Sequence, residues 1–202
     1  VLERRPVFMK ELKRNLAYKP GFYVMVSGNH GGLTDETGMY VGTHTHNISS
    51  LDRFITVQAK YLPPAIEEQI LCDNELTIIK DDQSRKAMAA ALVDLATVIR
   101  MLNLGPRADK FLHPEAMARQ RAKDIAGQRG DGLQLEVTMS TRMLRRCAKL
   151  FLASKDIEKL PEFAGREKPI TYALKLAGMD IAATETVNAV CEIGNLIMTG
   201  GT

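Results

Sequence analysis

The spacing of apolar residues divides the chain into a short part that favours strands and a longer part that favours helices. Residues 22–27 and 54–59 are two short runs of aromatic and β-branched residues, which predict strands buried on both faces. A loop and a short helix at residues 48–52 separate them, and this order is typical of a parallel sheet with crossover connections. From residue 65 onward apolar residues recur at helical spacing, and no further strand is predicted.

The longest predicted helix spans residues 84–104. It carries one apolar stripe and ends at a Gly-Pro pair, and the stripe consists of Met88, Leu92, Leu95, Ile99 and Leu102. Other helices are predicted at residues 65–71, 114–126, 140–153, from 169 onward, and 184–198. Ser140 is the predicted N-cap of its helix. The predicted fold class is therefore α/β, with the end of an α/β core in residues 1–71 and an all-helical domain in residues 72–202.

Composition and charge exclude few kinds of protein. The 202 residues are 45% apolar and 25% charged, as in an ordinary globular protein, and the net charge of +3 does not by itself require a nucleic-acid partner. Basic residues do cluster in residues 4–19, which predicts either a solvated hairpin or a contact with a polyanion. No apolar run appears long enough to cross a membrane, so we expect a cytoplasmic protein without a membrane partner.

Three cysteines, Cys72, Cys147 and Cys191, lie far apart in apolar helical surroundings. An odd number of widely spaced cysteines predicts buried free thiols rather than disulfides or metal ligands.

The most informative motif follows the first predicted strand. It reads Gly-Leu-Thr-Asp-Glu-Thr-Gly-Met-Tyr-Val-Gly-Thr over residues 32–43, and Leu-Asp-Arg-Phe follows at residues 51–54. This order resembles the MoxR-type branch of AAA+ ATPases, and within that branch the ATP-hydrolysing subunit of aerobic cobaltochelatase. Residues 61–63, 139–142 and 170–197 also resemble segments of that family, whereas residues 105–130 look like an insertion. The resemblance implies the end of a P-loop NTPase core sheet followed by a helical lid.

Three residues match functional positions of that family. Asn29 resembles the sensor-1 residue, a neutral amide that can orient a water without adding charge. Arg53 resembles the arginine finger, which would act in trans on the nucleotide of a neighbouring subunit. Arg142 resembles the sensor-2 arginine, which lies on the lid and contacts phosphate. The resemblance thus assigns Asn29 and Arg53 to catalysis and Arg142 to nucleotide binding.

The first half of such an ATPase is missing from these 202 residues. They contain no Gly-x-x-x-x-Gly-Lys-Ser/Thr loop and no apolar strand that ends in Asp-Glu. The glycine-rich loop at residues 31–42 has the wrong spacing for a phosphate cradle and no lysine after it. We therefore expect a C-terminal fragment that lacks Walker A and Walker B. ATP and Mg²⁺ would be bound mainly by the missing part, and this fragment alone is not expected to bind or hydrolyse ATP.

Histidines near the motif invite a metal hypothesis. His44 and His46 share a face only if their segment is extended, and His30 lies nearby in sequence. Because histidines in a polar loop are usually ordinary loop residues, no metal site is predicted.

The resemblance implies an ATP-driven remodelling subunit that assembles into a homo-oligomeric, hexamer-like ring. Its expected partner is a protein with a von Willebrand factor A domain. Its expected task is metal insertion into a corrin ring or activation of another target. A DNA-associated translocase is the first alternative, because related AAA+ ATPases carry a hairpin where the basic residues 4–19 lie. A non-hydrolysing interaction module is the second, if the chain truly starts at Val1.

Overall fold

The computed structural model describes residues 7–17, 55, 57, 59–129, 133–157 and 168–199. The chain divides into two compact units, residues 1–58 and residues 59–202.

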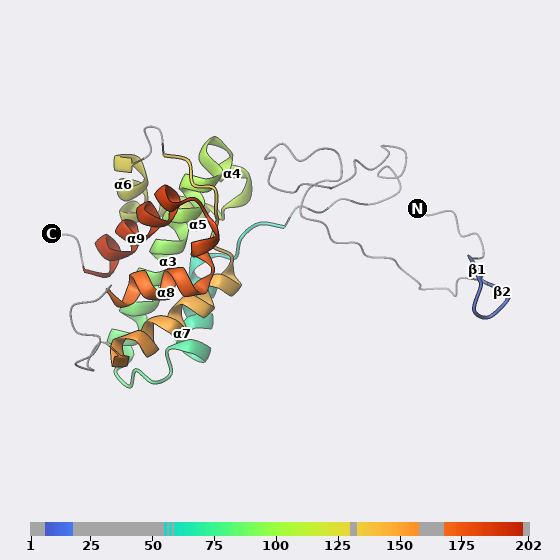
Figure 1. The fold of residues 1–202 in the computed structure, drawn as a ribbon, viewed down its shortest axis with the longest axis horizontal. Coiled ribbons are helices and arrows are strands. Elements are labelled where there is room, and N and C mark those ends of the chain that lie inside the picture. The colour runs from blue at the N-terminus through green and yellow to red at the C-terminus, as the bar shows by residue number, and fades with distance from the viewer. Residues whose placement is uncertain are drawn as a thin grey trace. The chain divides into compact units, whose positions relative to one another are not determined.

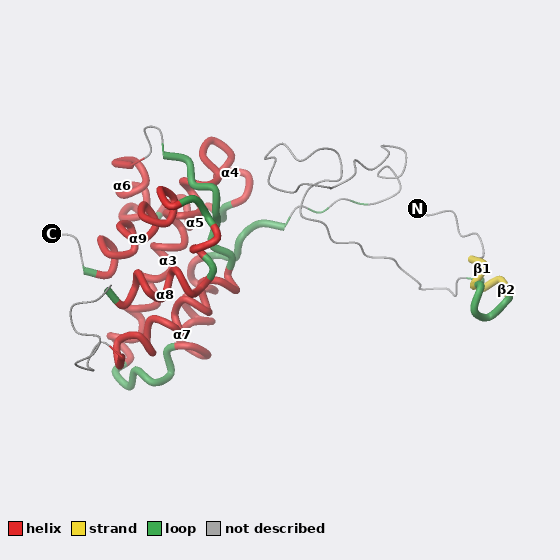
Figure 2. Tube along the Cα trace, in the orientation of Figure 1, coloured by secondary structure: helices red, strands yellow, loops and turns green. Residues whose placement is uncertain are grey.

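The first unit contains a small antiparallel hairpin, whose strands are yellow and whose turn is green in Figure 2. Strand β1 (Val7–Met9) pairs with β2 (Arg14–Leu16), with Val7 opposite Leu16. The turn between them is exposed, and Lys13 adopts a left-handed backbone conformation with φ 50°. A basic turn therefore projects from the hairpin into solvent.

The described part of the second unit is built from helices (Figure 1). Its α-helices are α2 (Pro64–Ile70), α3 (Asp82–Leu104), α4 (Ala108–Phe111), α5 (Pro114–Ala118), α6 (Gln120–Arg129), α7 (Thr141–Ile157), α8 (Pro169–Ala177) and α9 (Thr184–Met198). A π-helical turn, η1 (Leu71–Glu75), extends α2, and short 3₁₀ turns are η2 (Gly105–Arg107) and η4 (Met179–Ile181).

Helix α3 lies at the centre of this unit. Every side chain from Leu92 to Leu102 is buried, and α3 packs against α6, α7 and α9, while α8 packs between α7 and α9 (Figure 1). The second half of α3 is therefore enclosed by other helices on all sides. The main apolar core lies among these helices.

Local chemistry sets the ends of α3. Asp81 caps its start, where the carboxylate accepts a hydrogen bond from Ser84 N at 2.7 Å. Hydrogen bonding from the side chain of Ser84, and then from its backbone, lowers the pKa of Asp81. Gly105 ends the helix with φ 52°, a conformation that glycine adopts without steric cost.

The predicted α/β class is wrong. Within the described residues the β1–β2 hairpin is the only sheet, and the second unit is helical. In the predicted strand 54–59, residues Ile55, Val57 and Ala59 lie outside any strand, and Ile55 and Val57 are 95% and 83% exposed. A strand-like run of apolar residues becomes a strand only where neighbours pair with it and bury it. The other predicted strand, residues 22–27, and the helix at residues 48–52 lie outside the described residues.

The helical predictions are largely confirmed. Helix α3 ends at Leu104 and α9 spans Thr184–Met198, as predicted, while α3 begins at Asp82 rather than residue 84. The helix predicted at residues 114–126 is broken at Arg119 into α5 and α6. Helix α2, predicted as part of an α/β core that ended at residue 71, belongs instead to the unit that begins at Ala59.

One segment of the described chain, Asp82–Phe111, is long and apolar enough by length and composition to cross a membrane. The prediction that no run reaches this length is therefore wrong. Its most apolar window is 72% buried inside the helical unit, as expected for a core helix.

Candidate functional site

Of the three predicted site residues, the structure describes Arg142. Asn29 and Arg53 lie outside the described residues, and so do His30, His44 and His46. The candidate site is therefore built around Arg142 and the elements that hold it.

Arg142 is the second residue of α7, and its side chain is exposed. It forms no hydrogen bond or ion pair with another described residue. Two more arginines lie on the same helix: Arg146, one turn further, is also exposed, whereas Arg145 Nε donates to Glu75 Oε1 at 2.6 Å. Arg145 is thus occupied, and Arg142 is the arginine nearest the helix start that can bind a ligand.

The start of α7 is fixed by two side chains with different partners. Ser140 Oγ accepts a hydrogen bond from Met143 N at 3.2 Å, which confirms the predicted N-cap. Thr141 Oγ1 instead donates to Glu67 Oε1 of helix α2 at 2.6 Å. The residue directly before Arg142 is therefore tied to a different helix.

Glu67 belongs to a buried ion pair with Arg100 of helix α3. Arg100 Nη1 and Nη2 donate to the two oxygens of Glu67 at 2.7 and 2.8 Å, and both side chains are at most 2% exposed. Arg100 Nε donates to the carbonyl oxygen of Met139 at 2.7 Å. Buried charges are tolerated when they are paired and fully hydrogen-bonded, and this pair meets both conditions.

Tyr61 covers the same ion pair. Its ring centroid lies 4.3 Å from Arg100 Cζ, a cation–π distance, and its hydroxyl lies 3.0 Å from Thr138 Oγ1. Its backbone N–H donates to Phe111 O at 3.0 Å. The first residues of the helical unit are thus joined to α3, α4 and the segment before α7.

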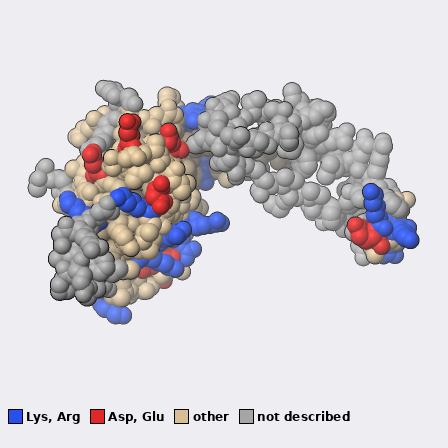
Figure 3. Space-filling model, in the orientation of Figure 1, with Lys and Arg blue, Asp and Glu red and all other residues tan. Residues whose placement is uncertain are grey.

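The surface around Arg142 is basic. Helix α7 carries Arg142, Arg145, Arg146, Lys149 and Lys155 and a single acid, Asp156. In Figure 3, Lys and Arg atoms gather on the lower part of the helical unit, where Figure 1 places α7. Glu75, whose side chain is 1% exposed, pairs with Arg145 and Lys149 and neutralises part of this charge. Arg142, Arg146 and Lys155 form no ion pair with another described residue and carry the remaining charge.

This arrangement suits the binding of an anion. A guanidinium offers planar, bidentate donation to phosphate or carboxylate oxygens, and the positive end of the α7 dipole lies beside Arg142. The described residues contain no group of three or more His, Cys, Asp or Glu side chains that could hold a metal ion. The chemistry that Arg142 offers is contact with an anionic group.

A scan of protein-family models and searches of curated proteins and of solved structures find no match to this chain.

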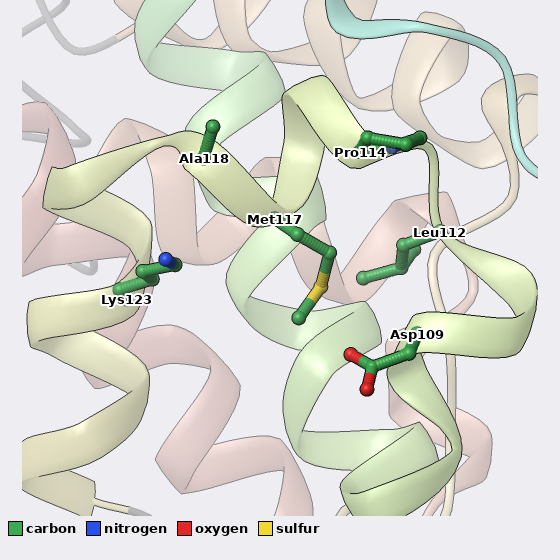
Figure 4. Close-up of a pocket in the computed structure, with 6 residues that line it drawn as sticks. All are labelled: Asp109, Leu112, Pro114, Met117, Ala118 and Lys123. Atoms are coloured by element: carbon green, nitrogen blue, oxygen red, sulfur yellow. The ribbon is translucent and has the colours of Figure 1, made fainter.

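A second feature, an open hollow of about 380 Å³, lies at the junction of α4, α5 and α6. Figure 4 shows Met117 at its centre, with Asp109 and Lys123 on opposite sides. The remaining lining residues are Leu112, Pro114 and Ala118. None of these is a predicted site residue, and the hollow lies within the segment predicted to be an insertion.

The cysteines behave as predicted. None of the three forms a disulfide; Cys147 and Cys191 are buried, whereas Cys72 is only half-buried. Burial raises the pKa of the Cys147 thiol to about 12, with a smaller contribution from Cys191, so this thiol stays protonated and inert near neutral pH.

Sequence reasoning missed Glu67 and Arg100. A signal for Arg100 was present, because it is one of two charged residues, with Asp94, inside the mainly apolar run from Leu92 to Leu104. Polar residues recur there at every third position: Asp94, Thr97, Arg100 and Asn103. All four are buried and hydrogen-bonded. No comparable signal distinguishes Glu67 from its neighbour Glu68.

Proposed function

We propose that this chain is part of an ATP-hydrolysing remodelling subunit of the AAA+ class, similar to the MoxR branch and to the cobaltochelatase ATPase. In this proposal the helical unit acts as the lid, and Arg142 contacts a phosphate of the bound nucleotide. The single observation that carries the proposal is the exposed, unpaired state of Arg142, within the described chain, at the anchored start of α7.

Two further features support it. The helical unit follows the motif at residues 32–54 in the order that the resemblance implies. The hairpin at Val7–Leu16 precedes that motif, in the place where related AAA+ ATPases carry a hairpin.

Arg142 would act by charge and geometry alone. Its guanidinium stays protonated at any physiological pH, and it can donate two parallel hydrogen bonds to oxygens of one phosphate. Since phosphoryl transfer is promoted mainly by positioning and charge stabilisation, an arginine held at a fixed place contributes without taking part in proton transfer. Nucleotide binding would then draw α7, and with it the helical unit, toward the phosphate.

Asn29 and Arg53 keep the roles that the resemblance implies. Asn29 would orient the attacking water, and Arg53 would reach the nucleotide of a neighbouring subunit in the ring. The phosphate loop and the ligands of Mg²⁺ would come from a part of the subunit outside these 202 residues.

The proposal is tested on the subunit expressed from its complete reading frame. Arg142→Ala is expected to lower kcat/KM for ATP roughly 10- to 100-fold, because one charge-assisted contact contributes about 1.5–3 kcal/mol. Arg146→Ala is the matched control, since it removes the same charge from an exposed position one turn away. We expect it to change kcat/KM less than about twofold, as for an exposed charge that contacts nothing.

Two results would contradict the proposal. A complete subunit without ATPase activity would exclude the enzyme. Equal effects of Arg142→Ala and Arg146→Ala would show that general positive charge on α7, rather than a specific phosphate contact, is responsible.

Binding to a polyanion is a second candidate function, and the hairpin favours it. Lys10, Lys13 and Arg14 are exposed around its turn. If the turn contacts DNA, the double variant Lys10→Gln/Arg14→Gln weakens binding, and the slope of log affinity against log salt becomes shallower by up to about two. An unchanged slope in a filter-binding or fluorescence titration would reject a role of this turn in DNA binding.

A further inference from the structure

The contacts of Thr141 differ from those of an ordinary threonine in a helix. Within α3, Thr97 Oγ1 donates to the carbonyl oxygen of Val93, one turn back on its own helix, at 2.8 Å. Thr141 Oγ1 instead donates to a carboxylate of another helix, Glu67, at 2.6 Å. The cap of α7 is already supplied by Ser140, so the Thr141 hydroxyl is not needed to begin the helix.

The partner of Thr141 is itself immobilised. Both oxygens of Glu67 accept hydrogen bonds from Arg100, and the pair is buried. The same guanidinium binds the carbonyl oxygen of Met139, two residues before Thr141. The chain is therefore held at Met139 and at Thr141 by one ion pair, immediately before Arg142 becomes exposed.

We infer that Thr141 and Glu67 are positioning residues for Arg142: together with Arg100, they fix the backbone from which Arg142 reaches an anionic phosphate. This inference rests on the proposed function. The side chain of Arg142 is free to move, but its Cα is not, which restricts the volume that the guanidinium samples. Tyr61, near the start of the helical unit, contacts both Arg100 and Thr138. A displacement of Tyr61 would therefore reach the start of α7 through Arg100.

The test removes only the Thr141 hydroxyl. In the complete subunit, Thr141→Val is expected to lower kcat for ATP roughly tenfold, because a displaced catalytic contact is costly even when it is still present. Thr141→Ser, which keeps the hydroxyl, should retain most of the kcat. Thr97→Val is the matched control for loss of a threonine hydroxyl within the same unit, and it should leave kcat unchanged.

Thermal unfolding gives the Tm of each variant, and titration with a fluorescent ATP analogue gives its affinity for the nucleotide. A merely structural role of Thr141 predicts a lower Tm with unchanged kcat, and a positioning role predicts a lower kcat with Tm within a few degrees of the wild type. An equal loss of kcat in Thr141→Ser and Thr141→Val would also overturn the inference, because the hydroxyl would then not be responsible.

Failure of the inference can be told apart from failure of the proposed function. If Arg142→Ala lowers kcat/KM while Thr141→Val leaves kcat unchanged, the function stands and the positioning role is rejected. If Arg142→Ala has no effect on ATP affinity or turnover, both are rejected.

Discussion

Two parts of the helical unit are held in different ways. Helices α3, α6, α7, α8 and α9 share the main apolar core, in which side chains such as Leu92, Ile99 and Leu144 are fully buried. The segment of η2, α4 and α5, residues 105–118, packs on Met101 of α3 in a separate small cluster with Ala108, Leu112 and Ala116. The first part is held by many apolar contacts, and the second by few.

The difference shows where a fixed site can be built. Arg142 lies on α7, whose later residues Cys147, Ala148 and Phe151 are buried in the main core. The open hollow beside Met117 lies instead on the lightly held segment. Because local stability follows the number of buried apolar contacts, we expect the start of α7 to be rigid and residues 105–118 to open first.

Loss of Arg100 should have the largest effect on stability. Arg100→Met leaves the Glu67 carboxylate buried without its charge partner, and this costs about 3–5 kcal/mol in the free energy of unfolding. Urea denaturation measures it. The double variant Glu67→Leu/Arg100→Met should recover most of the loss, and a single-variant loss below about 1 kcal/mol would mean that the pair is not buried as described.

Arg119 joins the lightly held segment to the main part. It donates to Asp94 and to Glu68, the latter at 2.6 Å, and lies between α5 and α6. Burial opposes its charge, but these hydrogen bonds outweigh that effect and raise the pKa of Arg119. Arg119→Gln should cost about 1.5–3 kcal/mol.

Hydrogen exchange locates the effect of Arg119→Gln. We expect faster exchange in residues 105–118 and little change in α8 and α9. Uniformly faster exchange across the unit would contradict a separate, lightly held segment.

Gly194 tests the packing of the main core. A Cβ at this position would lie 2.7 Å from Leu174 Cδ1 and 3.2 Å from Ile170 Cγ1. Gly194→Ala therefore requires the side chains of Leu174 and Ile170 on α8 to shift, and it should cost about 1–3 kcal/mol. A neutral result in thermal or urea unfolding would show that this helix contact is looser than the structure indicates.

Substitution of Gly127 should give the smallest change in the free energy of unfolding, and it should increase that free energy rather than lower it. It lies within α6, is exposed, and a Cβ there meets no atom within 4 Å. Gly127→Ala should stabilise the protein by about 0.5–1 kcal/mol, because alanine loses less conformational entropy in a helix. A destabilisation would mean that this face of α6 contacts another part of the protein.

The helices could be predicted from sequence because each buries an apolar stripe at helical spacing, and local signals such as Ser140 and Gly105 mark their ends. The strand at residues 54–59 could not, since a strand depends on a neighbour that its own residues do not specify. The break at Arg119 was missed for a similar reason: its partners Asp94 and Glu68 lie on other helices.

The candidate site was predictable only in part. The motif at residues 139–142 indicated Arg142, but not which arginine of α7 is free. That depends on Glu75, which lies 70 residues from Arg145 in sequence and was not predicted to approach it. The anchoring of Thr141 to Glu67, 74 residues apart, was invisible for the same reason.

The most direct test of the central claim is hydrogen exchange on the complete subunit, with and without a non-hydrolysable ATP analogue. We expect that the ATP analogue protects residues 138–146 at the start of α7, that ADP protects them less, and that residues 105–118 are unaffected. Bound nucleotide with unchanged exchange in residues 138–146 would contradict it, because Arg142 would then not contact the phosphate.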